Sequence, residues 1–151
     1  MSAAEGGSSG AGGRALQQAP GLWRTDLQRQ DLSVPGREVV QSRVDIGSEA
    51  PLVKHTHPGE EIIYVLEGLL EYQIEGQPPK TFNAGDALTV PAGVIHAVRN
   101  VGSGNAAELA TYVVKKGEAA PHAGRVSARP TGPVVRCRQP TQEVENYVQR
   151  S

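Results

Sequence analysis

The stretch HTHPGEEIIYVLEG, residues 55–68, places two histidines and two glutamates around a Pro-Gly turn that leads into a strand-like pattern. If the segment before the turn is extended, His55 and His57 point to the same face, because side chains alternate along a strand. Pro58-Gly59 is typical of a chain reversal, so a glutamate on the next strand lies opposite the imidazoles. Such a pair of histidines alone is more often structural, so further ligands must converge before it indicates a metal site.

The two glutamates compete for one position. Glu60 and Glu61 are adjacent and therefore face opposite sides of the strand, so only one of them can reach an ion beside the histidines. If Glu61 points inward, Ile63 and Val65 fill the interior of the domain. Both faces of EIIYVLE are apolar, so the spacing alone leaves the choice between the two glutamates open.

A second cluster, GDALTVPAGVIHAVRN at residues 85–100, carries another histidine. Its pattern predicts a strand, a turn at Pro91-Ala92-Gly93, and His96 on the following strand. Taken alone, His96 is best interpreted as a half-buried histidine bonded to backbone. Together with the first cluster, it is a candidate third imidazole ligand.

Both clusters resemble the motifs of the cupin family. The first fits HxH, three residues, Glu, six residues, Gly, and the second fits Gly, five residues, ProxGly, two residues, His, three residues, Asn, ending at Asn100. The resemblance selects Glu61 over Glu60. It implies a jelly-roll barrel over about residues 39–114 that holds one divalent metal ion through four ligands: His55, His57, Glu61 and His96. One departure is that seven residues, not the usual five, separate Gly47 from His55, which affects the preceding turn.

The surrounding sequence also indicates an all-β domain, because short strand-like segments follow one another without a convincing helix. These segments are EVVQSRVDI, PLVKHTH, EIIYVLE, LLEYQIE, ALTV, VIHAVRN and ELATYVV. We therefore predict a cupin β-barrel domain over residues 22–117, between a flexible tail at 1–21 and an irregular C-terminal tail at 118–151.

The C-terminal tail is rich in Pro, Gly and Arg. We expect its arginines to be solvated, His122 to lie outside the site, and Cys137 to react freely with thiol reagents. Residues 141–150 are predicted to form at most one or two helical turns.

Composition excludes several classes of function. Fifteen basic and sixteen acidic residues give a formal charge of -1. The overall electrostatic field of the protein therefore does not favour binding to nucleic acid or to a membrane. The single cysteine excludes an intrachain disulfide and a thiolate zinc module, which favours a cytoplasmic location. No signal peptide or membrane-spanning segment is recognised, and no helix-turn-helix pattern precedes the barrel.

The ligand set that the resemblance implies suits Fe, Mn, Ni, Co or Zn and leaves coordination positions for a small-molecule substrate. The favoured function is a metal-dependent enzyme, either a dioxygenase-like oxidoreductase or an isomerase, acting on a small oxygenated organic molecule. The alternative is a non-catalytic metal- and ligand-binding module for sensing or storage.

Two further side chains are weak catalytic candidates. Tyr72 shares the parity of Leu70 and Ile74, which could place its hydroxyl in the cavity, but packing with an exposed hydroxyl is the favoured interpretation. Arg43 could face an anionic substrate, and contact with solvent is favoured for it.

The last expectation is a homodimer built around residues 22–46. EVVQSRVDI is a candidate edge strand, and exposed edges pair with other chains. The irregular stretch expected before it contains Trp23 and several aliphatic residues, which we expect to be buried between subunits. Packing of this stretch over its own barrel is the alternative.

Overall fold

The computed structural model describes residues 13–118, and within this range it contains nine β-strands and no helix. The strands are β1 Leu16–Ala19, β2 Leu22–Asp31, β3 Arg37–Ile46, β4 Glu60–Glu67, β5 Leu69–Ile74, β6 Lys80–Asn83, β7 Ala87–Val90, β8 His96–Asn100 and β9 Ala106–Lys115. The described part of the chain holds no helix that could cross a membrane. The predicted all-β class is confirmed.

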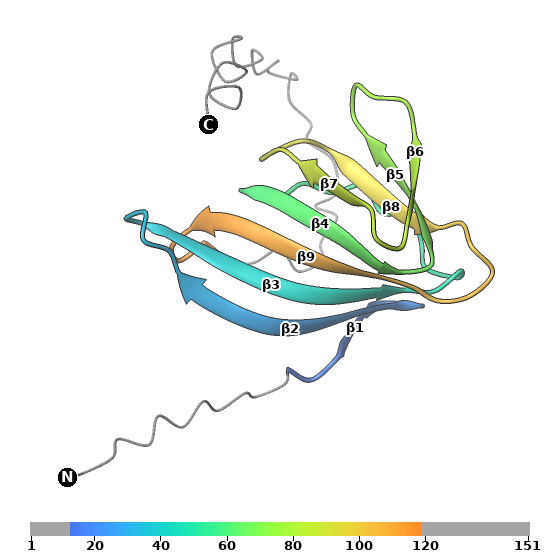
Figure 1. Cartoon of the computed structure of the whole chain (residues 1–151), viewed down its shortest axis with the longest axis horizontal. Helices are drawn as coiled ribbons and strands as arrows, with labels where there is room; N and C mark the ends of the chain where they lie inside the picture. Colours follow the sequence, from blue (N-terminus) through green and yellow to red (C-terminus); the bar gives the residue numbers. More distant parts are fainter. Residues whose placement is uncertain (1–12, 119–151) are drawn as a thin grey trace, which may run out of the picture.

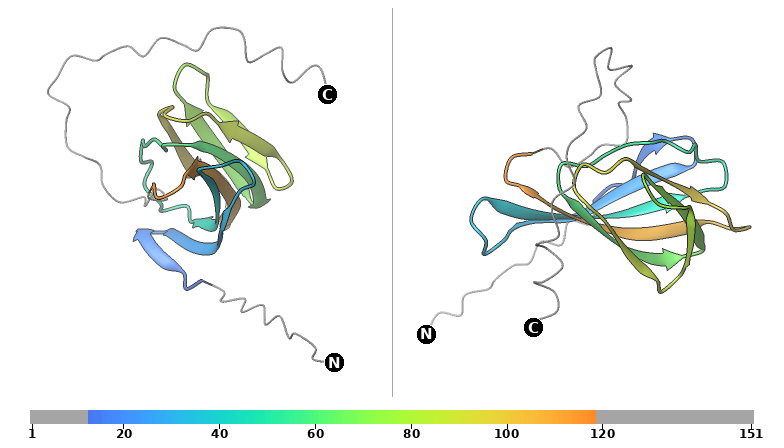
Figure 2. Two further views of the ribbon diagram at one scale, coloured as in Figure 1. Left: turned by 90° about the vertical axis from the view of Figure 1, so that its left-hand side faces the viewer. Right: turned by 90° about the horizontal axis from the view of Figure 1, so that it is seen from above.

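The strands form two antiparallel sheets that face each other (Figures 1 and 2). The six-stranded sheet has the order β1-β2-β3-β9-β4-β7, and the three-stranded sheet has the order β6-β5-β8. Strand β9 lies between β3 and β4, so the last strand of the domain is central in the larger sheet. Side chains from both sheets, including Ile63 and Val65 of β4 and Leu70 and Tyr72 of β5, form one apolar core.

The burial pattern of β4 shows which of its side chains face the interior. Glu61, Ile63 and Val65 are buried, whereas Glu60 and Ile62 are exposed. This alternation confirms the orientation that the resemblance implied. The outer face of β4 is apolar as well, which is why the sequence pattern alone could not determine the phase.

The N-terminal part of the domain differs from the prediction. We expected residues 1–21 to be a tail and residues 22–36 to be irregular, but Leu16–Ala19 and Leu22–Asp31 are strands β1 and β2. They form an antiparallel hairpin through Gly21, which has a φ of 68°. Because β2 is largely polar and exposed beyond Arg24, it lacks the alternation by which a half-buried strand is recognised. The domain therefore begins before residue 22.

The position of β3 also corrects an expectation. EVVQSRVDI lies within β3, and β3 pairs with β2 on one side and with β9 on the other. It is an internal strand, so it cannot provide the free edge on which the homodimer argument relied.

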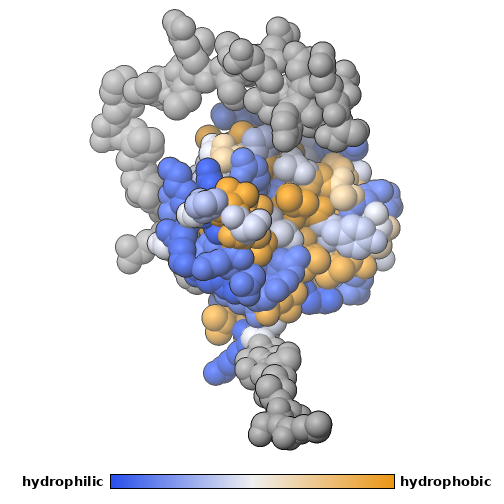
Figure 3. All heavy atoms as spheres, turned by 60° about the vertical axis from the view of Figure 1, so that its left-hand side comes forward, coloured by the Kyte–Doolittle hydropathy of each residue, from blue (hydrophilic) through white to orange (hydrophobic). Residues whose placement is uncertain are grey.

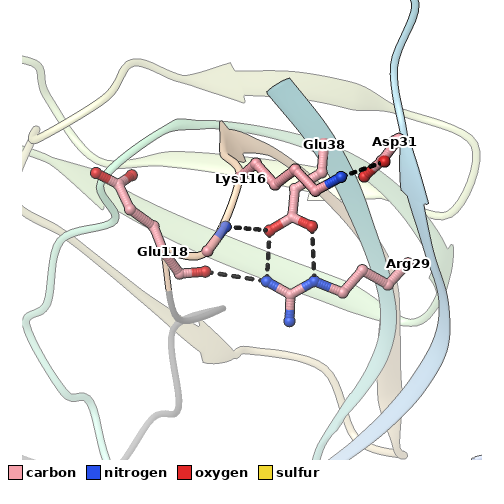
Figure 4. Close-up of polar contacts among 6 residues, drawn as sticks. Arg29, Asp31, Glu38, Lys116 and Glu118 are labelled. Carbon is pink, nitrogen blue, oxygen red and sulfur yellow. Dashed lines mark hydrogen bonds and ion pairs between the residues drawn. The ribbon is translucent and has the colours of Figure 1, made fainter. Parts of the chain in front are cut away.

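A polar cluster ties the β2–β3 hairpin to the end of the domain (Figure 4). Arg29 donates two hydrogen bonds to the buried carboxylate of Glu38, at 2.9 and 2.5 Å. The backbone N–H of Gly117 also donates to Glu38, at 3.3 Å, and Lys116 pairs with Asp31. These contacts hold the segment that follows β9. His122, Cys137, the tail arginines and residues 141–150 lie outside the described residues.

Candidate metal centre

The three candidate histidines meet at one end of the cavity between the sheets. His55 and His57 lie on the segment that precedes β4. Within this segment only His55 is in a β-bridge, and its partner is His96. The backbone N–H of His55 donates to the carbonyl of His96 at 2.9 Å, and the backbone N–H of His96 donates to the carbonyl of His55 at 3.0 Å. The expected strand over residues 51–57 is therefore reduced to this bridge, yet it fixes two of the imidazoles side by side.

The turns on either side of the cluster are built as the sequence predicted. Gly59 follows His57 and passes very close to β9, where an added Cβ would lie 1.9 Å from the carbonyl oxygen of Val113. Gly93 has a φ of 74°, which a side chain rarely adopts, in the turn that aims His96. Both turns therefore need glycine for the ligand-bearing segments to converge.

The fourth candidate, Glu61, points at the histidines. Its Oε2 lies 3.2 Å from Nε2 of His57 and 3.0 Å from Nε2 of His96. The three imidazole rings have centroids 4.3 to 4.9 Å apart. Glu60, by contrast, is exposed on the outer face.

Backbone contacts orient two of the rings. Nδ1 of His55 lies 2.9 Å from the carbonyl oxygen of Val53, and Nδ1 of His96 lies 3.0 Å from that of Val94. A carbonyl only accepts hydrogen bonds, so each Nδ1 carries a proton, and in the neutral ring Nε2 then keeps its lone pair. This tautomer is the one in which Nε2 can ligate a metal ion.

The donor atoms of the cluster fit a cation. Among the described residues, both ring nitrogens of His57, Oε2 of Glu61 and Nε2 of His96 are buried without a hydrogen-bond partner. An unsatisfied buried polar group costs about 1–3 kcal/mol, so the three of these atoms that lie together, Nε2 of His57, Nε2 of His96 and Oε2 of Glu61, require compensation. Ligand atoms of the three histidines lie within 4.8 Å of one another, a spacing suited to one metal ion.

The electrostatics favour the charged form of Glu61 and the neutral form of His55, whereas the pKa of His96 is raised, because burial lowers it less than its contacts with Glu61 and the Val94 backbone raise it. Burial raises the pKa of Glu61, but the contacts with His57 and His96 outweigh it and lower the pKa to about 2. Burial lowers the pKa of His55 below its usual value. Near neutral pH, Glu61 is an anion and His55 is a neutral base.

A cavity of about 60 Å³ lies beside this cluster. Strands of both sheets line it, and its lining residues are Gln18, Leu22, Arg24, Val44, His55, His57, Glu61, Tyr72, His96, Val98, Glu108 and Tyr112. Tyr72 is buried, and its hydroxyl donates a short hydrogen bond to Oε2 of Glu108. The favoured interpretation of Tyr72, an exposed hydroxyl, is therefore wrong, and the alternative orientation into the cavity is the one observed.

Glu108 is a second buried carboxyl close to the candidate ligands. Burial, followed by repulsion from Glu61, raises its pKa to about 8, although the hydrogen bond from Tyr72 acts in the opposite direction. Burial likewise raises the pKa of Tyr72 well above its usual value. Near neutral pH, Glu108 therefore retains a proton that an exposed carboxyl would have lost, and Tyr72 also keeps its proton.

Arg43 does not belong to the cavity. Its guanidinium donates to Asp45 of the same strand, at 2.8 Å, and lies 3.6 Å from Glu67. Buried neighbours on β3 alternate with Arg43, so it occupies the outer face of the larger sheet. The interpretation of Arg43 as a solvent-facing residue is correct, and it is not a catalytic candidate.

Three ionisable cavity residues were missed from the sequence. Glu108 and Tyr112 share one face of β9, and the alternation of that strand could have indicated both as inward-facing. Arg24 had no such signal, because the strand that carries it was not recognised. It is buried, and its Nε donates to Asp26 at 2.8 Å.

Residues 41–115 match the family model described as Cupin domain. The chain belongs to the cupin superfamily. Among solved structures, an RmlC-like cupin from Shewanella frigidimarina NCIMB 400 is 21% identical, covers 76% of this chain and 95% of its own, and has a TM-score of 0.56. Hydroxypropylphosphonic acid epoxidase from S. wedmorenis is 24% identical, with coverage of 66% and 54% and a TM-score of 0.54. At these identities the similarity establishes the jelly-roll fold.

Curated relatives share shorter stretches with this cupin. Dimethylsulfoniopropionate lyase DddQ of Ruegeria pomeroyi is 44% identical over 45 residues, which is 30% of this chain and 22% of the lyase. Germin-like protein 1-1 of Oryza sativa subsp. japonica is 37% identical over 79 residues, 49% of this chain and 37% of the relative. The chain thus spans well under half the length of either relative.

Proposed function

We propose that this cupin is a metal-dependent enzyme of the isomerase type, which moves a proton within a small oxygenated organic molecule. His55, His57, Glu61 and His96 hold one divalent ion of Fe, Mn, Ni, Co or Zn. The observation that carries the proposal is the buried Tyr72–Glu108 pair in the same cavity as the four donors.

The metal ion, when bound, supplies a Lewis acid that polarises a substrate oxygen. Tyr72 and Glu108 supply the proton transfer, which requires an acid or base other than the metal ligands. Their hydrogen bond lets one group accept a proton while the other donates, and burial in the apolar core keeps water from competing. A pKa near the working pH, as for Glu108, suits a group that both takes and returns a proton.

The buried pair disfavours a module that only stores or senses a metal. Burying a carboxyl away from water costs several kcal/mol unless a partner compensates it. A metal-storage site gains nothing from a second carboxyl that does not point its charge at the ion. The relative named as a lyase supports enzymatic activity, although it aligns with less than a third of this chain.

The cavity limits the substrate to a small molecule. Its volume is about 60 Å³, and the β1–β2 hairpin contributes Gln18, Leu22 and Arg24 to its wall. A molecule of a few non-hydrogen atoms can therefore contact the donor cluster and Tyr72 together.

Solvent-hydrogen exchange tests the proposal. Metal-loaded protein in D₂O is incubated with a panel of small hydroxy and oxo compounds, and NMR follows deuterium incorporation next to the carbonyl or carbinol carbon. We expect exchange by the parent, a loss of about 100-fold or more in Tyr72→Phe and Glu108→Gln, and unchanged metal content in both.

Oxygen consumption is measured in parallel with Fe(II)-loaded protein. Oxygen uptake without exchange would overturn the proposal in favour of the dioxygenase-like alternative. Metal binding without either reaction would favour the sensing or storage module.

A further inference from the structure

Arg24 is the one arginine or lysine among the described residues that line the cavity. It lies on β2, with only 6% of its surface exposed. Transferring a guanidinium from water to a protein interior is unfavourable unless anions or dipoles surround it. A buried cation that faces a substrate-sized space is thus unusual.

A small network fixes the guanidinium. Its Nε donates to Oδ1 of Asp26 at 2.8 Å, and the hydroxyl of Ser42 donates to the same oxygen at 2.7 Å. The Asp26 side chain is 55% exposed, so this carboxylate lies at the solvent side of the arginine. The Asp26 carboxylate thus positions the Nε atom of Arg24.

Tyr112 links this cation to the donor cluster. The centre of the Arg24 guanidinium lies 5.2 Å from the centroid of the Tyr112 ring, and the ring of His57 lies 5.0 Å from the same centroid. Arg24, Tyr112 and the candidate metal ligands line the same cavity of about 60 Å³. A small molecule that fills this cavity with an oxygen at the cluster and an anionic group at its other end would contact both.

We infer that Arg24 binds the carboxylate of the substrate, which makes the substrate class a small organic acid with a second oxygen donor at the His55, His57, His96 and Glu61 cluster. This inference rests on the proposed function. The charge of the site agrees with it, because Asp26 balances Arg24 and Glu61 offsets only one of the two charges of a divalent ion. Guanidinium and carboxylate groups also match in geometry, through paired N–H donors and oxygen acceptors.

The competing explanation is a purely structural ion pair with Asp26. Arg43 provides a matched control, because it pairs with Asp45 two residues along its own strand in the same sheet, but on the outer face. A structural role alone predicts that both arginines affect folding and that neither discriminates among ligands.

The test uses zinc-loaded protein, with 3-hydroxypropionate and its uncharged amide as probes, and calorimetry to measure affinity. We expect the parent to bind the acid more tightly than the amide. Arg24→Gln should lower the affinity for the acid about tenfold or more and change the affinity for the amide less than threefold. The reason is that a lost hydrogen bond to a charged group costs more than about 1.4 kcal/mol. The acid affinity of Arg24→Lys should lie between those of the parent and Arg24→Gln. The affinities of Arg43→Gln should match those of the parent.

Two results would overturn the inference. One is an equal loss of affinity for the acid and the amide in Arg24→Gln, and the other is a parent that binds the acid no more tightly than the amide. If Arg24→Gln fails to fold, which thermal melting would show, Arg24→Lys takes its place, and a ratio of acid to amide affinity equal to that of the parent would overturn the inference. Failure of the proposed function has a different signature, namely a parent without hydrogen exchange that still selects the acid through Arg24.

Discussion

At the scale of single residues, the site depends on which face of β4 carries a carboxylate. Glu61 is buried against His57 and His96, whereas Glu60 is exposed. We predict that Glu61→Gln lowers metal affinity at least about tenfold and that Glu60→Gln leaves it within twofold. Competition titration with a chromogenic chelator measures both. Equal loss in the two variants would contradict the assignment of Glu61.

The residue scale also shows why some of the site could be predicted and some could not. The cupin motifs in two short stretches identified His55, His57, Glu61 and His96, whereas the spacing alone left the choice between Glu60 and Glu61 open. The buried Tyr72–Glu108 contact joins strands 36 positions apart in the sequence, and no local pattern encodes such a pair. The pKa of Glu108 depends on that packing and had no sequence signal.

At the scale of elements, the turn before β4 is constrained by its contact with β9. An added Cβ at Gly59 would meet the backbone of Val113, whereas one at Gly104 would meet nothing within 4 Å. We predict that Gly59→Ala lowers the free energy of unfolding by about 2 kcal/mol or more and weakens metal binding. Gly104→Ala should change both by little, since its site is open. Chemical denaturation measures the stability, and similar values for both variants would contradict this account of the turn.

The contact between the β2–β3 hairpin and the end of β9 predicts a dependence on pH. The hydrogen bond from Arg29 is the largest influence on Glu38 and lowers its pKa below 4.5. Because the folded state holds this proton less tightly than the unfolded state, the pair stabilises the fold above about pH 4.5 and ceases to do so as pH falls through the lower folded pKa.

Denaturant midpoints from pH 3 to 7 test this dependence. The parent should exceed Glu38→Gln in stability above pH 5, and the two should converge at the acid end. Arg29→Gln should behave like Glu38→Gln, and the double variant should add nothing further. A constant difference across the range would contradict the role of the Glu38 charge.

The β1–β2 hairpin is the element that sequence reasoning missed. β1 has four residues, and β2 presents mostly exposed side chains, so neither shows the apolar alternation of a core strand. β2 is defined by its pairing with β3, and β1 by its pairing with β2, and hydrophobic periodicity reveals neither of these backbone pairings. The arginine that closes the cavity was lost with them.

At the scale of the whole molecule, the homodimer stays a prediction with a changed basis. β3 is internal, but β1 pairs with β2 only as far as Arg24 and Gly13 lies against the backbone of Asp26, so residues 27–31 have no paired strand on that edge within the described part of the chain. Exposed apolar side chains lie along this region: Leu16, Trp23, Leu27, Leu32 and Val34. Figure 3 shows apolar side chains among hydrophilic ones on the face in view. An open edge beside apolar side chains favours pairing with a second copy.

Light scattering at micromolar concentration should give about twice the chain mass of 15.9 kDa. Leu27→Lys should yield monomers. Leu66→Lys, a similarly exposed position on the outer face of β4, should remain dimeric. A parent at the monomer mass would exclude the dimer. The predicted cytoplasmic location and the absence of nucleic-acid and membrane partners also stay predictions.

The central claim is that three histidines and one glutamate of this cupin hold a single metal ion. Elemental analysis of protein purified without added ions, compared with His55→Ala, His57→Ala and His96→Ala, tests it most directly. We predict about one divalent ion per parent chain and the loss of most of it in each variant, because a site reduced to three ligands forfeits much of its preorganised affinity. Full occupancy in all three variants, or a parent that binds no ion even after loading, would contradict the account.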